Sequence, residues 1–167
     1  HNKDQVVLQP IDAFSDPQQV FVSSYNKGGW ILDMLGYYVG DETLDRIMRE
    51  YVRLYRDRIA DVDDFIAVAE DVSGMDLSRF FDDWLKTTEK CDYAVTAVEG
   101  ERVTLARNGD IVMPVTVAVN FDSGSVHYER WDGEDSEYSF TVDGGSSIIS
   151  VVIDPQRRTL DAHLANN

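Results

Sequence analysis

The spacing of apolar residues changes near residue 90 of this 167-residue chain, and that change limits the folds open to it most strongly. Before residue 90, apolar residues recur three and four positions apart, as on one face of an α-helix. After residue 90, they alternate with polar residues in short segments rich in Val, Ile, Tyr and Thr, as in β-strands. We therefore expect an α+β fold, in which an antiparallel helical bundle at residues 1–90 is followed by a β-sandwich at residues 91–167.

Four amphipathic helices are predicted in the first part. The first begins near Tyr25 and ends at Gly40, and Asp76 is expected to cap the fourth. Asp61 is the expected N-cap of the third helix, which ends at Gly74. The short loops between the helices favour antiparallel neighbours. The four apolar stripes are Ile31, Met34, Leu35, Tyr38 and Val39; Leu44, Ile47, Met48, Tyr51 and Tyr55; Val62, Phe65, Ile66, Ala69 and Val72; and Leu77, Phe80, Phe81, Trp84 and Leu85.

Six short strands are predicted in the second part, at residues 93–100, 102–109, 111–121, 125–131, 138–142 and 147–153. Turn-forming pairs such as Asn108-Gly109 and Asp132-Gly133 separate them. Pro114 indicates an edge strand or the start of a strand, because it has no N–H to donate. Six short strands at this spacing predict a β-sandwich.

The chain is strongly acidic, with a net charge of −16. Residues 1–90 carry 10 basic and 18 acidic side chains, and residues 91–167 carry 5 and 13, so the charge is spread evenly. Nucleic-acid binding is excluded, because phosphate contacts need clustered Lys and Arg. No apolar run reaches the roughly 20 residues of a membrane span. We interpret the acidic residues as a solvated surface.

The chain's own residues do not make up a complete active site. The three histidines, His1, His127 and His163, lie far apart in the sequence, and no HExxH pair occurs. Cys91 is the only cysteine and is interpreted as structural, and His127 as an ordinary strand residue. The acidic pairs at residues 63–64 and 82–83 point about 100° apart on their helices and do not share a face. We therefore expect no metal site within this chain.

The stretch "SSYNKGGWILDML", residues 23–35, places Gly28 and Gly29 where a helix is predicted to start, and each glycine costs about 1 kcal/mol relative to alanine. A "YNKGG" helix start, a Gly-Asp-Glu turn at residues 40–42 and the segment "SGMDLSRFFDDW" at residues 73–84 follow one another here. In this order and spacing they resemble the C-terminal part of the catalytic domain of the M1 family of zinc aminopeptidases, a gluzincin family. The ending "VVIDPQRRTLDAHLANN" is similar to that of bacterial members that carry a fibronectin III-like β-sandwich.

The resemblance implies a catalytic role for Tyr25. In the family this tyrosine donates a hydrogen bond to the oxyanion that forms when zinc-bound water attacks the peptide carbonyl. A phenol keeps its proton at neutral pH and can donate a hydrogen bond, and losing one oxyanion donor typically costs about 2.7–4 kcal/mol. We expect a helix N-terminus to add a positive potential at Tyr25. We also expect Gly28 and Gly29 to let neighbouring backbone lie close around the cleft.

The resemblance also implies that this chain is the C-terminal piece of a longer bacterial hydrolase. Zinc would bind to an upstream HExxH helix in the full-length parent, and none is expected to bind here. The partners would be the upstream catalytic and N-terminal domains and a peptide substrate, whose binding residues the sequence does not identify. The isolated piece is expected to be inactive. Similar bacterial proteins are often located outside the cytoplasm or at a membrane.

Two other functions stay open at the sequence level. The first is a non-catalytic scaffold, in which a peptidase-like fold serves only for interactions. The second is a β-sandwich binding module, in which Tyr128, Trp131 and Tyr138 present an aromatic face to a sugar or a peptide.

Overall fold

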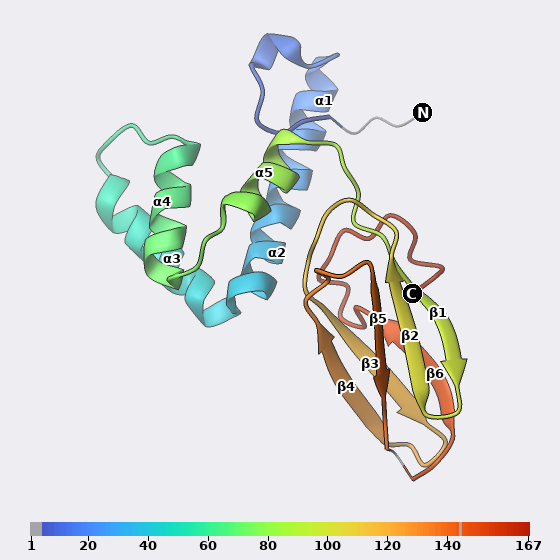
Figure 1. Cartoon of the computed structure of the whole chain (residues 1–167). Coiled ribbons are helices and arrows are strands. Elements are labelled where there is room, and N and C mark those ends of the chain that lie inside the picture. The colour runs from blue at the N-terminus through green and yellow to red at the C-terminus, as the bar shows by residue number, and fades with distance from the viewer. Residues whose placement is uncertain (1–4, 144) are drawn as a thin grey trace. The chain divides into compact units, whose positions relative to one another are not determined.

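The computed structural model describes residues 5–143 and 145–167 of the chain. Helices form its first part and two antiparallel sheets form its second part (Figure 1), so the predicted α+β class is confirmed. The chain divides into two compact units, His1–Thr88 and Glu89–Asn167. We call them the helical unit and the β unit and describe each by itself.

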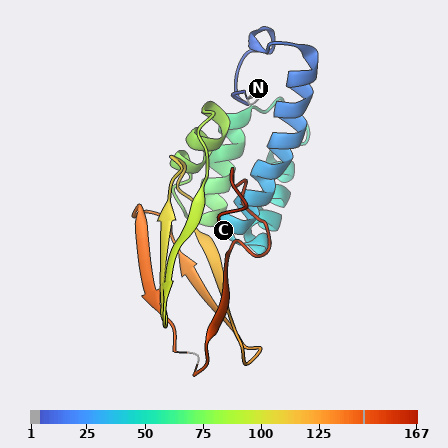
Figure 2. The same ribbon diagram turned by 90° about the vertical axis from the view of Figure 1, so that its right-hand side faces the viewer.

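The helical unit opens with a continuous helical rod that is longer than the sequence predicted. After the short 3-10 helix η1 (Ile11–Ala13), the elements α1 (Pro17–Phe21), η2 (Val22–Lys27) and α2 (Gly28–Val39) follow one another without a break, as the blue helix of Figure 2 shows. Asp16 starts the rod, because its side chain accepts a hydrogen bond of 2.9 Å from the N–H of Gln19. The predicted helix start near Tyr25 is therefore wrong.

The rod ends where the sequence predicted, at Gly40. This glycine has a φ of 94°, a conformation that favours glycine and turns the chain directly into α3 (Asp41–Tyr55). Two further helices follow, α4 (Val62–Ser73) and α5 (Ser78–Lys86). α4 begins with the predicted cap, since Asp61 and Asp64 each accept a hydrogen bond from the other's backbone N–H. It ends at Gly74, with a φ of 70°.

The start of α5 differs from the prediction that Asp76 caps it. The N-cap position is Leu77, and the Asp76 carboxylate accepts a 3.0 Å hydrogen bond from the N–H of Ser78, the first helical residue. A carboxylate of α4 also reaches this helix start. Glu70 Oε1 accepts a 3.0 Å hydrogen bond from the Leu77 N–H, so the neighbouring helix satisfies a donor at the start of α5.

The predicted stripes supply the core of the helical unit. Phe65 of α4 packs edge-on against Tyr51 of α3, with ring centroids 5.2 Å apart, and against Phe81 of α5 at 6.2 Å. Met48 was predicted to lie in a buried stripe but is 38% exposed. It follows the buried Ile47 and therefore points about 100° away from it around the helix. The buried apolar residues are Ile31, Met34, Leu35, Ile47, Val68, Ala69, Leu77, Phe80, Phe81 and Trp84.

The β unit consists of two three-stranded antiparallel sheets. One has the order β1-β2-β5, and the other has the order β4-β3-β6. The predicted strand at residues 111–121 is shorter than expected and begins at Val115, directly after Pro114. The strands are β1 (Tyr93–Glu99), β2 (Arg102–Arg107), β3 (Val115–Phe121), β4 (Val126–Trp131), β5 (Glu137–Thr141) and β6 (Ile148–Ile153).

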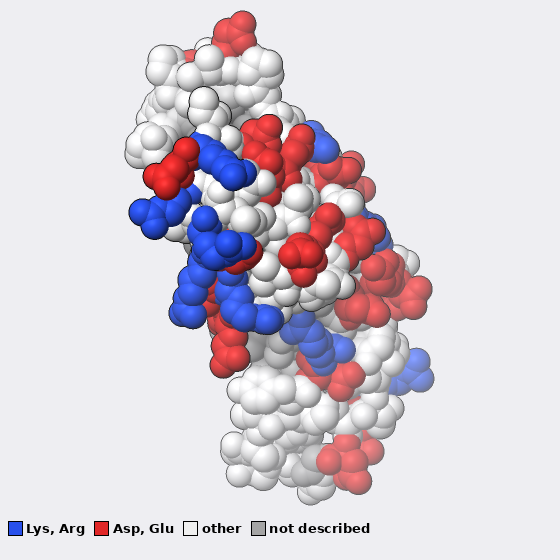
Figure 3. All heavy atoms as spheres, turned by 90° about the vertical axis from the view of Figure 1, so that its left-hand side faces the viewer, with Lys and Arg blue, Asp and Glu red and all other residues white. Residues whose placement is uncertain are grey.

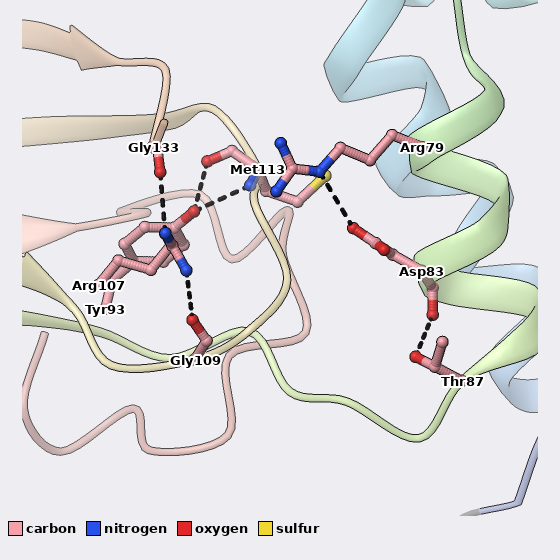
Figure 4. Close-up of polar contacts among 8 residues, drawn as sticks. All are labelled: Arg79, Asp83, Thr87, Tyr93, Arg107, Gly109, Met113 and Gly133. Carbon is pink, nitrogen blue, oxygen red and sulfur yellow. Dashed lines mark hydrogen bonds and ion pairs between the residues drawn. The ribbon is translucent and has the colours of Figure 1, made fainter. Parts of the chain in front are cut away.

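A buried tyrosine and a half-buried arginine organise one end of the β unit (Figure 4). The Tyr93 hydroxyl donates to the carbonyl of Met113 at 2.6 Å and accepts from the N–H of the same residue at 2.9 Å. Arg107 donates to the carbonyls of Gly133, at 2.9 Å, and Gly109, at 2.6 Å. Gly133 has a φ of 79°, and a Cβ there would lie 2.6 Å from both the Met113 carbonyl and the Tyr93 hydroxyl. This turn therefore requires glycine.

Figure 4 also shows how α5 of the helical unit ends. Arg79 and Asp83 lie four residues apart, with Arg79 Nε 3.8 Å from a carboxylate oxygen of Asp83. The Thr87 hydroxyl donates to the Asp83 backbone carbonyl at 2.7 Å, which satisfies one acceptor in the last turn.

Residues 161–166 cross back to β1, the outer strand of its sheet, and we call them the strap. The Ala162 N–H donates to the Cys91 carbonyl at 2.8 Å, and the Val95 N–H donates to the Asn166 carbonyl at 3.0 Å. The Tyr93 N–H donates to the Asp161 carboxylate at 2.9 Å. The strap therefore covers the open backbone of an edge strand.

Candidate functional site

Tyr25, to which the resemblance assigns a catalytic role, lies in the π-helical segment η2 and not at a helix N-terminus. A π-helix forms its hydrogen bonds one residue farther along the chain than an α-helix, which widens each turn. The Gly28 N–H donates to the carbonyl of Ser23, five residues back, and this bond closes the wide turn around Tyr25. The expected positive potential of a helix N-terminus at Tyr25 is wrong, because the rod already starts at Pro17.

The segment around Tyr25 buries polar side chains and exposes apolar ones. Gln19 and Ser23 are 4% and 2% exposed, whereas Phe21 and Tyr25 are 58% and 69% exposed. Val22 is 39% exposed. Grouped exposed apolar side chains are typical of surfaces that contact a ligand or another part of a protein. We call Phe21, Val22 and Tyr25 the apolar face of the rod.

Two aromatic rings of the apolar face are in direct contact. The Tyr25 ring stacks on the Phe21 ring, with centroids 4.8 Å apart and planes inclined by 24°. Phe21 is the last residue of α1, and Tyr25 lies in the middle of η2. The phenol of Tyr25 is therefore open to solvent along most of its surface while one ring face is supported.

The sequence reasoning missed Phe21 and the helix that carries it. Two signals could have found them. Asp16 followed by Pro17 is a typical helix start, and Phe21 precedes Tyr25 by four residues, the spacing that places two helical side chains next to each other.

Gly28 and Gly29 do not approach neighbouring backbone closely, contrary to expectation. A Cβ at either position would meet no atom within 4 Å, as far as the described residues go. Gly28 instead lines an apolar pocket of about 370 Å³ within the helical unit, whose wall includes Leu32, Tyr51 and Phe65. The glycine leaves this pocket open on the side of the rod.

Metal-ligating side chains are scattered rather than clustered. No three His, Cys, Asp or Glu side chains in residues 5–143 and 145–167 lie together in a way that could hold a metal ion. His127 lies 3.4 Å from Glu129 on β4, and His163 of the strap lies 2.8 Å from Asp92, while His1 falls outside the described residues. The described part of the chain therefore does not fit a zinc ion.

Cys91 is fully buried, and burial raises the pKa of its thiol. It is therefore suited to a structural role, as the sequence suggested. Among residues 5–143 and 145–167, every helix is too short or too polar to span a membrane.

The proposed aromatic face of the β-sandwich does not form. Trp131 is 2% exposed and packs against Tyr93 and Tyr138, with ring centroids 5.1 and 5.8 Å apart. Tyr128 lies on the same strand but is 64% exposed. Three positions separate the two residues, and side chains at odd spacing along a strand point to opposite faces. Trp131 therefore belongs to the core, and Tyr128 points away from it.

Charged side chains of both signs share the surface, as Figure 3 shows for one face. Three arginines in α3 or just after it lie beside acidic neighbours: Arg49 is 3.5 Å from Asp45, Arg53 is 2.6 Å from Glu50, and Arg56 is 3.4 Å from Asp57. These arginines are therefore compensated by carboxylates of their own segment.

Comparison with known proteins gives a family match. The model of the peptidase family M1 domain matches residues 1–84. These residues make up half of the chain and include Tyr25. Aminopeptidase M1-D of Oryza sativa subsp. japonica is 29% identical over 119 aligned positions, and the match covers 64% of this chain and 13% of the rice protein. "Probable aminopeptidase 2" of Sulfurisphaera tokodaii is 28% identical over 144 aligned positions, and the match covers 80% of this chain and 17% of that protein.

A solved structure shares the fold. It is the crystal structure of Legionella pneumophila aminopeptidase A in complex with aspartic acid, with a TM-score of 0.60 and 18% identity. The match covers 74% of this chain and 16% of that one. The chain thus spans less than a fifth of the length of each of these relatives. From the match to the family model over residues 1–84, the chain belongs to peptidase family M1.

Proposed function

We propose that this chain is the C-terminal piece of a zinc aminopeptidase of the gluzincin type, and that it supplies Tyr25 to the reaction. Membership of family M1 and the two relatives named as aminopeptidases support peptide hydrolysis from the N-terminus. The observation that carries the proposal is the position of Tyr25, a tyrosine that is 69% exposed on a helix segment whose buried positions are polar.

In this proposal the Tyr25 hydroxyl stabilises negative charge on the substrate. When water attacks a peptide carbonyl, its oxygen becomes an oxyanion, and a phenol O–H can donate a hydrogen bond to it. The donor gains most when it is fixed before the reaction, because it then does not have to reorganise. The Tyr25 ring stacks on the Phe21 ring of the same rod, and this contact supports such a fixed donor.

The zinc ion and the general-base glutamate would come from an upstream part of the same polypeptide. When bound, zinc would activate the attacking water. The described residues hold no cluster that fits the ion, so the contribution of this chain is the tyrosine and the helices behind it. The apolar face of the rod would then line the cleft.

We also propose that the two parts of the chain serve different purposes. Residues 1–90 would complete the catalytic domain. Residues 91–167 would form a fibronectin III-like sandwich that supports it. The buried aromatic and glycine contacts at one end of the β unit suit such a structural role.

The test is Tyr25→Phe in the longer polypeptide. We expect kcat to fall about 100-fold to 1,000-fold, the usual effect of losing one oxyanion donor, while the zinc content by mass spectrometry stays the same. Tyr128→Phe is the matched control, since Tyr128 is 64% exposed and lies in the β unit. Unchanged turnover in Tyr25→Phe would refute the proposed role. A polypeptide that neither holds zinc nor cleaves peptides would instead be a non-catalytic scaffold.

A further inference from the structure

We propose that Phe21 is a positioning residue for Tyr25: its ring holds the phenol in the orientation that the reaction needs. The inference rests on the proposed function of Tyr25 and adds a second residue to the site. It starts from the stacked pair, in which the ring centroids are 4.8 Å apart and the planes are inclined by 24°.

Packing in the core does not explain Phe21. Its side chain is 58% exposed, while the buried positions beside it on the rod are taken by Gln19 and Ser23. A phenylalanine that faces solvent gains little from burial. Its main aromatic contact in the described structure is the Tyr25 ring.

Tyr25 needs such a support, because its backbone is fixed but its side chain is exposed. The hydrogen bond from the Gly28 N–H to the Ser23 carbonyl fixes the backbone of the wide turn. The phenol is 69% exposed, so few atoms restrict its rotation about χ1. Helical side chains lean back towards the residue three or four positions earlier, and at Tyr25 this direction leads to Phe21.

The orientation matters because an oxyanion donor works only in a narrow geometry. A misplacement of about 1 Å in a catalytic group can lower the rate about 100-fold. A neighbour that restricts the phenol to one rotamer therefore raises the share of molecules ready to react. The effect should appear in kcat and not in KM, because Phe21 acts through Tyr25 and not on bound substrate.

The kinetic test compares variants of the longer polypeptide on peptides with different N-terminal side chains. We expect Phe21→Ala to lower kcat about fivefold on every peptide with KM unchanged, in line with the usual strength of an aromatic pair. Phe21→Tyr, which keeps a ring at this position, should restore kcat. Val52→Ala is the matched control, because Val52 lies on α3 and is 57% exposed; it should leave both constants unchanged.

A double variant separates this inference from the proposed function. In a Tyr25→Phe background, Phe21→Ala should have no further effect on kcat, because the donor is already gone. If Tyr25→Phe itself leaves kcat unchanged, the proposed function fails. If Tyr25→Phe lowers kcat and Phe21→Ala does not, only the positioning role is overturned. KM changes that differ between peptides would also overturn it, because they would place Phe21 against the substrate.

A second measurement tests the physical half of the inference on the present chain. The χ1 rotamers of Tyr25 can be read from three-bond NMR couplings. We expect one dominant rotamer in the wild type and averaging among rotamers in Phe21→Ala, with the couplings of Tyr128 unchanged. Unchanged rotamer populations of Tyr25 in Phe21→Ala would overturn the positioning role whatever the activity of the longer polypeptide.

Discussion

Replacing Tyr93 by phenylalanine removes one oxygen atom from the centre of the β unit, and the structure shows what that atom does. The hydroxyl donates to the Met113 carbonyl at 2.6 Å and accepts from the Met113 N–H at 2.9 Å. Both residues are fully buried. In Tyr93→Phe the two backbone groups of Met113 lose this partner at a place that water does not reach.

The size of the effect follows from the two groups left without this partner. A buried donor or acceptor that loses its partner costs about 1–3 kcal/mol. With one donor and one acceptor affected, and some relaxation around the new space, we expect the free energy of unfolding to fall by about 3 kcal/mol. The ring of the new phenylalanine still packs edge-on against Trp131, 5.1 Å away in the wild type, so the loss should come from the hydroxyl alone.

Urea unfolding measured by NMR checks this expectation. The indole N–H signal of Trp131 reports on the β unit, because this side chain touches Tyr93. Tyr128→Phe is the control, since its exposed hydroxyl should contribute less than about 0.5 kcal/mol. Hydrogen exchange of the Met113 N–H should also become faster. A loss in Tyr93→Phe no larger than that in Tyr128→Phe would refute the reasoning.

Two further predictions concern a helix start and a titration. Asp61→Ala removes the capping box of α4 and should lower the free energy of unfolding by about 1 kcal/mol, measured by thermal unfolding; Asp71→Ala, on an exposed side of the same helix, should cause no comparable loss. The hydrogen bond to Glu129 raises the pKa of Tyr138 to about 12, with burial as a smaller cause. The stability that this contact contributes is therefore present below pH 10 and is lost as the pH rises from about 10 to 12. Ultraviolet absorbance of the phenolate should show a late-titrating tyrosine that Glu129→Gln shifts to lower pH, and a titration unaltered by Glu129→Gln would contradict this.

The regular parts of the fold could be predicted because local rules decide them. The stripe of Ile31, Met34 and Leu35 is buried, and the cap at Asp61 and the end at Gly74 depend on residues next to them in the sequence. The six strands followed from alternation and turn pairs in the same way. The prediction that Pro114 marks an edge strand or a strand start was correct, because a residue without an N–H limits where a strand can begin.

The rod and the candidate site were harder to predict, because they depend on contacts far along the chain or on departures from regular spacing. The π-helical turn around Tyr25 does not follow the 3.6-residue period, so the spacing of its apolar residues does not indicate a helix. Gln19 and Ser23 are buried although they are polar, whereas the buried side of a helix usually carries apolar side chains. Asp76 lies one residue before the N-cap position, and it shares the start of α5 with Glu70 of another helix.

The strap has a consequence for how the β unit connects to the rest of a polypeptide. Because Cys91 forms a β-bridge with Asp161, two positions that are 70 residues apart in the sequence lie side by side in the β unit. A segment with adjoining entry and exit can be inserted, exchanged or deleted as a cassette without stretching the chain on either side. An exchange of the segment between Cys91 and Asp161 would therefore leave the two cut ends close together.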